Sequence, residues 1–558
     1  MDSVTDKAPA KTSPQPPKGE SAKTDSGPDA NAASGTAPDK VPQTDSSPTA
    51  EQLTDWGPFG RPLFDDPSAK ALKRVGVLDV GSNSVRMVVF DGAARSPAYF
   101  YNEKLLCGLG AGLNETGRLN PEGRRRALAA IKRFDILAAS MGVSPLSAVA
   151  TAAVRDAEDG PEFRAEVERE TNIKLWVIDG AEEARLSAQG VMLGWPGANG
   201  IVCDIGGSSM ELAEVGDGRV GRRVTSPLGP LKLRDIKGGK KAVNAHIRQV
   251  MTGLCEEMGR KPKRLYLVGG SWRAIARLDM ERRGYPLKVL HEYAMTPKAV
   301  RETVEWIAKS DAEEIRQLSG TSAERMALVP LASRVLRELV RQFGPKEIYV
   351  SSYGIREGLL YEQMPEKLRR RDPLIEAARF AEAKDARRPG FGKQLYEFLL
   401  PIFRNANHEK KRLVRAACLL HDVSWRAHPD YRHEVCFDNA TRANLGGLDH
   451  QGRVFLGLAL LHRYKNSRSG SRLEPLLGLL GDAEIAEAEA LGKAMRFGAM
   501  FSVDDPDRMG RLEWFPKKRL LRMIVDRTSR DLFGEVAETR LRALASALDA
   551  EVDVKFAK

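Results

Sequence analysis

The sequence lacks the long apolar segments and the paired cysteines that mark membrane proteins and disulfide-rich proteins. Its 558 residues contain no run of roughly eighteen apolar residues, which a helix needs to cross a bilayer. The five cysteines show no CxxC spacing, which argues against a zinc ribbon and fits a reducing compartment. No apolar segment follows a basic start, so we expect no signal peptide. These absences predict a cytoplasmic protein with no membrane partner.

The first 70 residues lack the side chains that form a core. Eight prolines fall within the first fifty positions, and no Leu, Ile or aromatic residue precedes Leu53. Such a segment cannot bury enough apolar surface to offset the entropy lost on ordering. We therefore predict a disordered tail over residues 1–70.

Acidic residues are fewer than basic ones, and the net charge is +12. The first fifty residues carry seven acids against five lysines, so the remaining chain carries +14. Basic clusters such as 124–126 and 517–519 contribute to this excess. The simplest partner for such a field is an anionic polymer or a phosphate-rich ligand. Solvated helix faces are the alternative for any single cluster, and we expect no specific nucleic-acid partner.

One short pattern occurs twice, at residues 78–90 and 203–215. In each copy an apolar run reaches Asp, an apolar residue and Gly, followed by three small polar residues and a second apolar run. Each copy predicts a hairpin whose tip of Gly and Ser lets an anion approach the backbone closely. Two copies predict two related subdomains around a shared cleft that holds a polyphosphorylated ligand and its metal. A purely structural turn is the alternative for either copy alone.

Alternating strands and helices continue to about residue 365, which predicts an α/β region. From residue 366 the apolar positions repeat with a helical period, which predicts an all-helical domain. We expect four parts: the tail at 1–70, subdomains at 71–198 and 199–365, and the helical domain at 366–558.

Five segments, in this order, resemble the Ppx/GppA family of exopolyphosphatases and guanosine pentaphosphate phosphatases, within the actin-like ATPase superfamily. They are Asp79–Ser84, Ala150–Ala157, Asp179–Arg185, Asp204–Leu212 and Tyr353–Leu359. The resemblance implies duplicated ribonuclease-H-like subdomains around a cleft. It also implies a hydrolase that removes terminal phosphate from inorganic polyphosphate, or the 5′ γ-phosphate from guanosine pentaphosphate, with Mg²⁺ or another divalent cation.

The resemblance also implies roles for individual residues. Glu182 is the expected base that activates water, and Asp204, Glu211 and Asp79 are the expected metal-site carboxylates. The expected phosphate contacts are Gly81, Ser82, Asn83, Ser84, Arg86, Arg155, Gly206, Gly207, Ser208, Ser209, Gly270 and Ser271. Phosphoryl transfer needs such groups, because it depends on positioning and on neutralising charge.

Each role has a structural alternative. Glu182 is also placed to cap a helix N-terminus, and Asp204 to bond its own turn. Arg155 is also suited to a surface ion pair, and the side chain of Glu211 to face solvent.

Several positions depart from the family pattern. Ser208 stands where the family usually has a third glycine, and its added Cβ hinders the approach of a ligand there. Trp272 and Arg273 are larger than expected; they either narrow the cleft, favouring a thin polyphosphate chain over a nucleotide, or pack at the end of a strand.

The C-terminal part resembles an HD-type domain through His421-Asp422. No histidine lies between His291 and His408, so the upstream ligand of a working HD metal site is missing. We therefore expect this domain to extend a polyphosphate channel or to form a homodimer.

The favoured function is a cytoplasmic exopolyphosphatase. Guanosine pentaphosphate phosphatase activity and a non-catalytic sensor of polyphosphate or an alarmone are the alternatives. A sugar or acetate kinase of the same superfamily is disfavoured because no motif for a second substrate is visible.

Overall fold

The first α/β subdomain is built on a five-stranded sheet. The computed structural model describes residues 74–92, 95–259, 261–468, 473–502 and 504–557, so the tail predicted for residues 1–70 lies outside the described residues. The strands are β1 (Val75–Val80), β2 (Ser84–Phe90), β3 (Tyr99–Leu106), β4 (Leu146–Ala150) and β5 (Leu175–Val177). Their order is β3-β2-β1-β4-β5, with β2 antiparallel to both neighbours and β4 parallel to β1 and β5.

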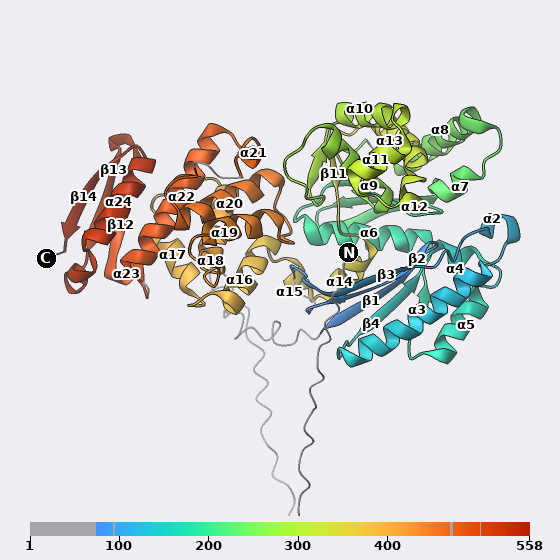
Figure 1. The fold of residues 1–558 in the computed structure, drawn as a ribbon, viewed down its shortest axis with the longest axis horizontal. Coiled ribbons are helices and arrows are strands. Elements are labelled where there is room, and N and C mark those ends of the chain that lie inside the picture. Colours follow the sequence, from blue (N-terminus) through green and yellow to red (C-terminus); the bar gives the residue numbers. More distant parts are fainter. Residues whose placement is uncertain (1–73, 93–94, 260, 469–472, 503, 558) are drawn as a thin grey trace, which may run out of the picture. The chain divides into compact units, whose positions relative to one another are not determined.

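Helices between these strands cover one face of the first sheet (Figure 1). They are α3 (Pro121–Ser140), α4 (Ala152–Asp156) and α5 (Gly160–Glu170), whereas the short α2 (Leu113–Thr116) lies beyond the end of the strands. Leu78 and Val80 of β1 pack against α3 and α5, whereas Val75 and Val77 face the opposite side. Both faces of β1 are therefore buried, which explains why Asp79 is its only polar side chain.

The second subdomain repeats this topology. Its strands are β6 (Gly200–Ile205), β7 (Met210–Gly216), β8 (Arg219–Ser226), β9 (Arg264–Val268), β10 (Tyr293–Met295) and β11 (Glu347–Val350). The order is β10-β11-β9-β6-β7-β8, so β8-β7-β6-β9-β11 corresponds to β3-β2-β1-β4-β5 and β10 is an added edge strand. This repeated order confirms the predicted duplicated ribonuclease-H-like fold.

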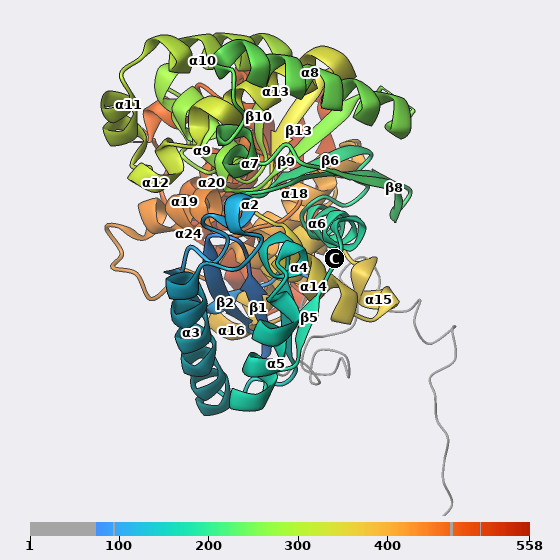
Figure 2. The same cartoon turned by 90° about the vertical axis from the view of Figure 1, so that its right-hand side faces the viewer.

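Helices cover both faces of the second sheet (Figure 2). The intervening helices are α7 (Pro230–Arg234), α8 (Gly239–Met258), α9 (Gly270–Arg282), α10 (Pro297–Lys309), α11 (Ala312–Ser319), α12 (Ala323–Met326) and α13 (Val329–Phe343). Residues of α8, α9, α10 and α13 form one core with this sheet. Helices α6 (Gly180–Gly194) and α14 (Ile355–Gln363) pack in a different core, which includes strands of both sheets. These two helices therefore link the subdomains.

The C-terminal region is mainly helical, as predicted. Its helices are α15 (Glu366–Arg369), α16 (Pro373–Asp385), α17 (Phe391–Leu399), α18 (His408–Leu420), α19 (Arg432–Arg442), α20 (His450–Tyr464), α21 (Glu474–Leu477), α22 (Asp482–Phe501), α23 (Pro506–Met509) and α24 (Glu535–Ala547). They bury one continuous apolar core.

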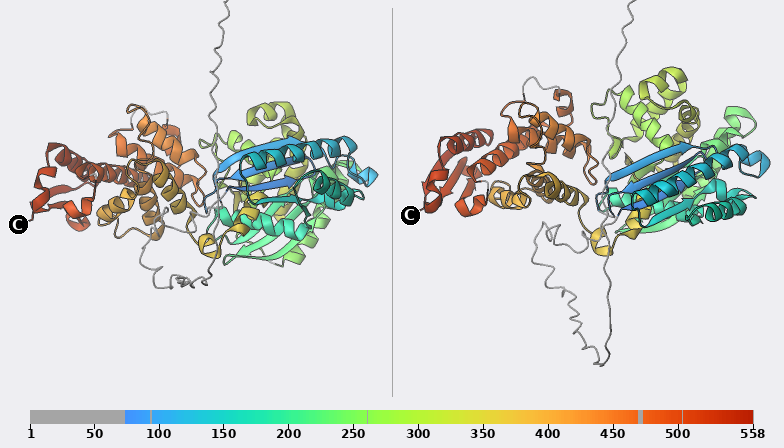
Figure 3. Two further views of the ribbon diagram at one scale, coloured as in Figure 1. Left: turned by 90° about the horizontal axis from the view of Figure 1, so that it is seen from below. Right: turned by 60° about the horizontal axis from the view of Figure 1, so that its bottom comes forward.

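The region ends in a sheet that the all-helical prediction did not include (Figure 3). Strands β12 (Gly510–Phe515), β13 (Leu520–Val525) and β14 (Glu551–Phe556) pair in the order β12-β13-β14, and the 3₁₀ turns η4 (Pro516–Lys518) and η5 (Arg527–Leu532) flank β13. Leu521, Met523 and Val525 alternate with less buried residues. This two-residue period is typical of a strand, and the helical prediction for the region overlooked it.

Candidate active site

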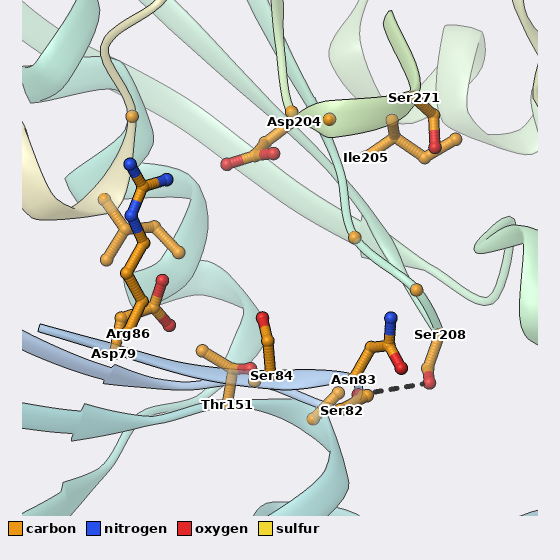
Figure 4. A pocket seen from close by; sticks show the side chains of 18 of the residues that line it. Asp79, Ser82, Asn83, Ser84, Arg86, Thr151, Asp204, Ile205, Ser208 and Ser271 are labelled. Atoms are coloured by element: carbon orange, nitrogen blue, oxygen red, sulfur yellow. Dashed lines mark hydrogen bonds between the residues drawn. The ribbon is translucent and has the colours of Figure 1, made fainter. Parts of the chain in front are cut away.

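The two predicted hairpin tips meet at one cavity. The hydroxyl of Ser208, on the β6–β7 tip, donates a hydrogen bond of 3.3 Å to the hydroxyl of Ser82, on the β1–β2 tip (Figure 4). The cavity beside them has a volume of about 250 Å³. The predicted residues that line it are Asp79, Gly81, Ser82, Asn83, Ser84, Arg86, Asp204, Gly206, Gly207, Ser208, Ser209, Gly270 and Ser271. Ser208 therefore joins the two tips.

Two of the expected backbone donors are occupied by the hairpins themselves. The amides of Gly81 and Gly206 donate to the carbonyls of Ser84 and Ser209, each at 3.0 Å. The tip amides that make no hydrogen bond to the described residues include those of Ser82, Asn83, Gly207, Ser208 and Ser209. These N–H groups are available to an anion.

A group of three buried carboxylates adjoins the tips. Glu183 and Asp204 line the cavity, and Glu211 is buried behind them with 1% of its surface exposed. Burial, together with the charges of Glu211 and Asp204, raises the pKa of Glu183 well above its usual value. Burial likewise raises the pKa of Glu211 to about 8.

Two oxygens in this group have no hydrogen-bond partner. Among the described residues, Oε2 of Glu183 and Oε2 of Glu211 accept no hydrogen bond, although Oε1 of Glu211 accepts one of 3.1 Å from Thr225. Asp204 accepts a hydrogen bond from the Ser187 hydroxyl. Buried carboxyl oxygens without a partner favour uptake of a proton or a cation.

The structure does not support Glu182 as the base. Its carboxylate is 36% exposed, accepts hydrogen bonds of 2.5 and 2.8 Å from Arg185, and does not line the cavity. The Arg185 guanidinium lowers the pKa of Glu182. Glu183 follows it in the first turn of α6, and one residue turns the side chain by about 100° around a helix. This step points the carboxylate of Glu183, and not that of Glu182, into the cavity.

Arg155 lies beside the carboxylates but does not line the cavity. Its guanidinium donates to the carbonyl of Ile178 at 3.2 Å and to Asp156 at 3.1 Å. Nη1 also lies 3.7 Å from Oε2 of Glu183. In this arrangement Arg155 stabilises the charged form of Glu183, and it is not placed as the phosphate contact that the sequence predicted.

Five basic side chains also line the cavity: Arg86, Lys104, Arg273, Arg325 and Arg356. Burial and the nearby arginines, Arg325 first among them, lower the pKa of Lys104 to about 8. Burial lowers the pKa of Arg273 to about 10, with further lowering by Arg356 and Arg325. Arg356 pairs with Asp79 at 3.1 Å. A bound polyanion would offset the mutual repulsion of these cations and raise their pKa values again.

Neighbouring strands bring part of this basic group together. Asp79 of β1 lies opposite Arg86 of β2, which in turn lies opposite Lys104 of β3. Lys104, Arg325 and Arg356 line the cavity although no site role was predicted for them. Arg356 lies in the family-like segment Tyr353–Leu359, whereas only the strand register or the tertiary fold places Lys104 and Arg325.

Trp272 and Arg273 have separate roles. Trp272 is fully buried in the core of the second subdomain and does not line the cavity, so it does not narrow the cleft. Arg273 does line the cavity and donates to the carbonyl of Ser352 at 3.2 Å. A Cβ at Gly270 would lie 1.5 Å from Nη1 of Arg325. Glycine is therefore required there for the guanidinium to approach.

In the part of the chain that the structure describes, no cluster of three or more His, Cys, Asp or Glu side chains is arranged to hold a metal ion. Among the described helices, none combines the length and the apolar character needed to span a bilayer.

Comparisons with known proteins give consistent relatives. A model of the Ppx/GppA phosphatase family matches residues 88–367, and a model of the exopolyphosphatase C-terminal domain matches residues 374–553. Exopolyphosphatase 1 of Mycobacterium bovis is 26% identical over 309 residues, covering 52% of this chain and 88% of the relative. Guanosine-5′-triphosphate,3′-diphosphate pyrophosphatase of Aeromonas hydrophila is 25% identical over 361 residues, covering 62% and 72%. The crystal structure of an exopolyphosphatase from Cytophaga hutchinsonii is 24% identical, with a TM-score of 0.48, and covers 52% of this chain and 97% of its own.

Proposed function

Because the chain belongs to the Ppx/GppA phosphatase family, we propose that it is an exopolyphosphatase, which hydrolyses the terminal phosphoanhydride bond of inorganic polyphosphate. One observation supports this most strongly: a single cavity joins buried carboxylates, free tip amides and five basic side chains. Hydrolysis of a phosphoanhydride needs all three, because water must be activated and the charge on the transferring phosphoryl group must be neutralised.

In this proposal Glu183 takes the role of base, which the family resemblance implied for Glu182. It lines the cavity beside the tips, and its unpartnered Oε2 is available to accept a proton from water. Burial raises the pKa of Glu183, and the Arg155 guanidinium at 3.7 Å opposes that rise and favours the ionised form that a base requires. Glu183 therefore orients the attacking water and takes its proton.

The donor set fits a divalent cation such as Mg²⁺. Asp204 lines the cavity and offers hard oxygen ligands, and the unpartnered oxygen of Glu211 adds negative charge behind it. Asp79 is less suited, because Arg356 already neutralises it. Mg²⁺ commonly uses only one or two carboxylates and completes its shell with phosphate oxygens and water. When bound, the cation supplies charge neutralisation at the phosphate oxygens.

The tip amides and the basic group hold the substrate. The free N–H groups of the tips suit the reacting terminal phosphate. Arg86, Arg273 and Arg325 offer forked donors to further phosphates of the chain. The geometry thus supports a linear polyanion as the substrate.

Guanosine pentaphosphate is the second candidate substrate. It is supported by the Aeromonas relative, which is named as a pyrophosphatase of guanosine-5′-triphosphate,3′-diphosphate. Trp272 does not exclude a nucleotide, because its side chain is buried away from the cavity. We also propose that the protein forms a homodimer and that its parts divide at residues 70, 198 and 365.

The substrate and the metal are tested together. We expect Mg²⁺-dependent release of orthophosphate from long-chain polyphosphate, with a higher kcat/KM than for guanosine pentaphosphate, and loss of release with a chelator. Purified protein is assayed on both substrates, with the chelator removed and Mg²⁺ restored as the control. Binding of both substrates without any release would instead support the sensor hypothesis.

The pH dependence of binding tests the role of Lys104. Because its pKa is lowered to about 8, Lys104 is charged below that pH and loses its charge above it. We expect kcat/KM for polyphosphate to fall as the pH rises past 8, and Lys104→Arg to remove that fall because arginine stays charged. The measurement is kcat/KM against pH for both proteins. An unchanged alkaline limb in Lys104→Arg would exclude Lys104 as its cause.

A further inference from the structure

A second cavity lies in the C-terminal region, at the His421-Asp422 pair. It has a volume of about 440 Å³ and lies where α18 ends and where residues of α20 and α22 approach it. Its polar lining consists of Arg387, Arg388, His421, Asp422 and Arg463. None of these residues belongs to the candidate active site.

The His-Asp pair is engaged in contacts that differ from metal ligation. Both carboxylate oxygens of Asp422 accept hydrogen bonds from the guanidinium of Arg387, at 2.6 and 2.9 Å. Nδ1 of His421 donates to the carbonyl of Cys418 at 2.8 Å. The described residues supply no third metal ligand around this pair. The guanidinium of Arg387 therefore occupies the carboxylate that would bind a metal ion in an HD-type site.

Arg463 is buried, and only the nearby Asp422, which already pairs with Arg387, partly compensates its charge. Only 7% of its surface is exposed, yet its guanidinium makes no hydrogen bond or ion pair with the described residues. It contacts the ring of Tyr464, with 4.9 Å between the guanidinium carbon and the ring centroid. Arg453 on the same helix provides a contrast, because its guanidinium donates to the carbonyls of Thr441, Ala443 and Leu445.

A buried and unpaired cation destabilises a protein strongly unless an anion neutralises it. The charges of Arg387 and Asp422 offset each other, and Arg388 forms an ion pair with Asp504. The cavity therefore carries one positive charge, that of Arg463, without an ion-pair partner among the described residues. An anionic ligand is the simplest group that satisfies it.

His421 determines which anion fits. Since a carbonyl only accepts hydrogen bonds, Nδ1 of His421 carries the proton and Nε2 of the neutral ring presents a lone pair. The ring of His421 makes its hydrogen bond to the described residues through Nδ1 and makes none through Nε2. Burial and the neighbouring Arg463 lower the pKa of His421 to about 3, so the ring stays neutral at physiological pH. The cavity thus offers cations together with one acceptor.

We propose that this cavity binds orthophosphate, with its oxygens against Arg463 and Arg387 and its P–OH donating to Nε2 of His421. Orthophosphate near neutral pH carries both negative charge and a hydroxyl group, whereas sulfate and the internal phosphates of a polyphosphate chain have no hydroxyl. The site therefore selects orthophosphate over these anions. Orthophosphate is also the product of the proposed hydrolysis, but binding at this cavity does not depend on that activity.

The test observes His421 directly in the full-length protein. With histidine labelled in the ring, the resonance of His421 is identified among the eight histidines by its loss in His421→Gln. We expect inorganic phosphate to shift this resonance saturably, and sulfate to bind about tenfold or more weakly because the hydrogen bond to Nε2 is lost. Phosphate in the active-site cavity does not touch His421, so the two sites are distinguished.

Variants at the two arginines complete the test. We expect the phosphate-induced shift to disappear in Arg463→Met and in Arg387→Met; the second variant, at a half-exposed residue, serves if the first does not fold. Arg442→Met removes an exposed guanidinium from α19 of the same region and should leave the shift unchanged. No shift with phosphate in wild type, a shift that survives in both arginine variants, or equal affinity for sulfate would overturn the proposal.

Discussion

Glu183→Gln is expected to stop orthophosphate release almost completely, whereas Glu182→Gln is expected to leave it near the wild-type rate. The loss of a general base typically lowers kcat by about 10²–10⁴-fold. Glutamine keeps the shape of the Glu183 side chain but cannot accept the proton of the attacking water. Glu182 pairs with Arg185 outside the cavity, so its charge has no part in the reaction.

The adjacent variant is a matched control, because both substitutions remove one carboxylate from the same turn of α6. We expect KM for polyphosphate to change only a few fold in Glu183→Gln, since the tips and the basic group remain. Unfolding temperatures of both variants establish that the fold is intact. The reverse pattern, with Glu182→Gln inactive and Glu183→Gln active, would return the base to Glu182.

The local patterns of the sequence predicted the framework of the site. The repeated Asp-x-Gly pattern with small residues placed both hairpins, and these hairpins meet at the cavity. The pattern works because the strand register and the tip chemistry are both local. Which of Glu182 and Glu183 faces the cavity depends on how α6 is rotated about its axis against its neighbours. The sequence of two adjacent glutamates does not reveal that rotation.

Arg86 of the basic group was predicted, but Lys104, Arg325 and Arg356 were not, for a different reason. Lys104 reaches the cavity through the register of β3 with β2, and Arg325 and Arg356 come from segments more than two hundred residues further along the chain. Non-local packing decides which of the many arginines of this chain converge. Trp272 illustrates the same limit, because its size suggested a narrowed cleft and its burial in the core became evident only from the fold.

Gly358→Ala is expected to destabilise the protein and to reduce its activity together. Helices α6 and α14 carry Glu183 and Arg356 to the cavity, and they cross at glycines. A Cβ at Gly358 would lie 1.9 Å from the carbonyl oxygen of Leu186, and a Cβ at Gly190 would lie 2.2 Å from that of Gly354. Backbone atoms cannot yield as a flexible side chain does, so the helices must separate. Overpacking of this kind costs about 1–3 kcal/mol or more per site.

Gly253→Ala in α8 is the matched control, because no atom lies within 4 Å of the added Cβ and alanine favours a helix by about 1 kcal/mol. Urea unfolding and kcat/KM are measured for Gly358→Ala, Gly190→Ala and Gly253→Ala. A separation of α6 from α14 moves Glu183 relative to Arg356, so the two crossing variants should lose kcat under conditions in which they remain folded. If both crossing variants instead matched Gly253→Ala in stability and in kcat, the close approach of α6 and α14 would not be what positions the base.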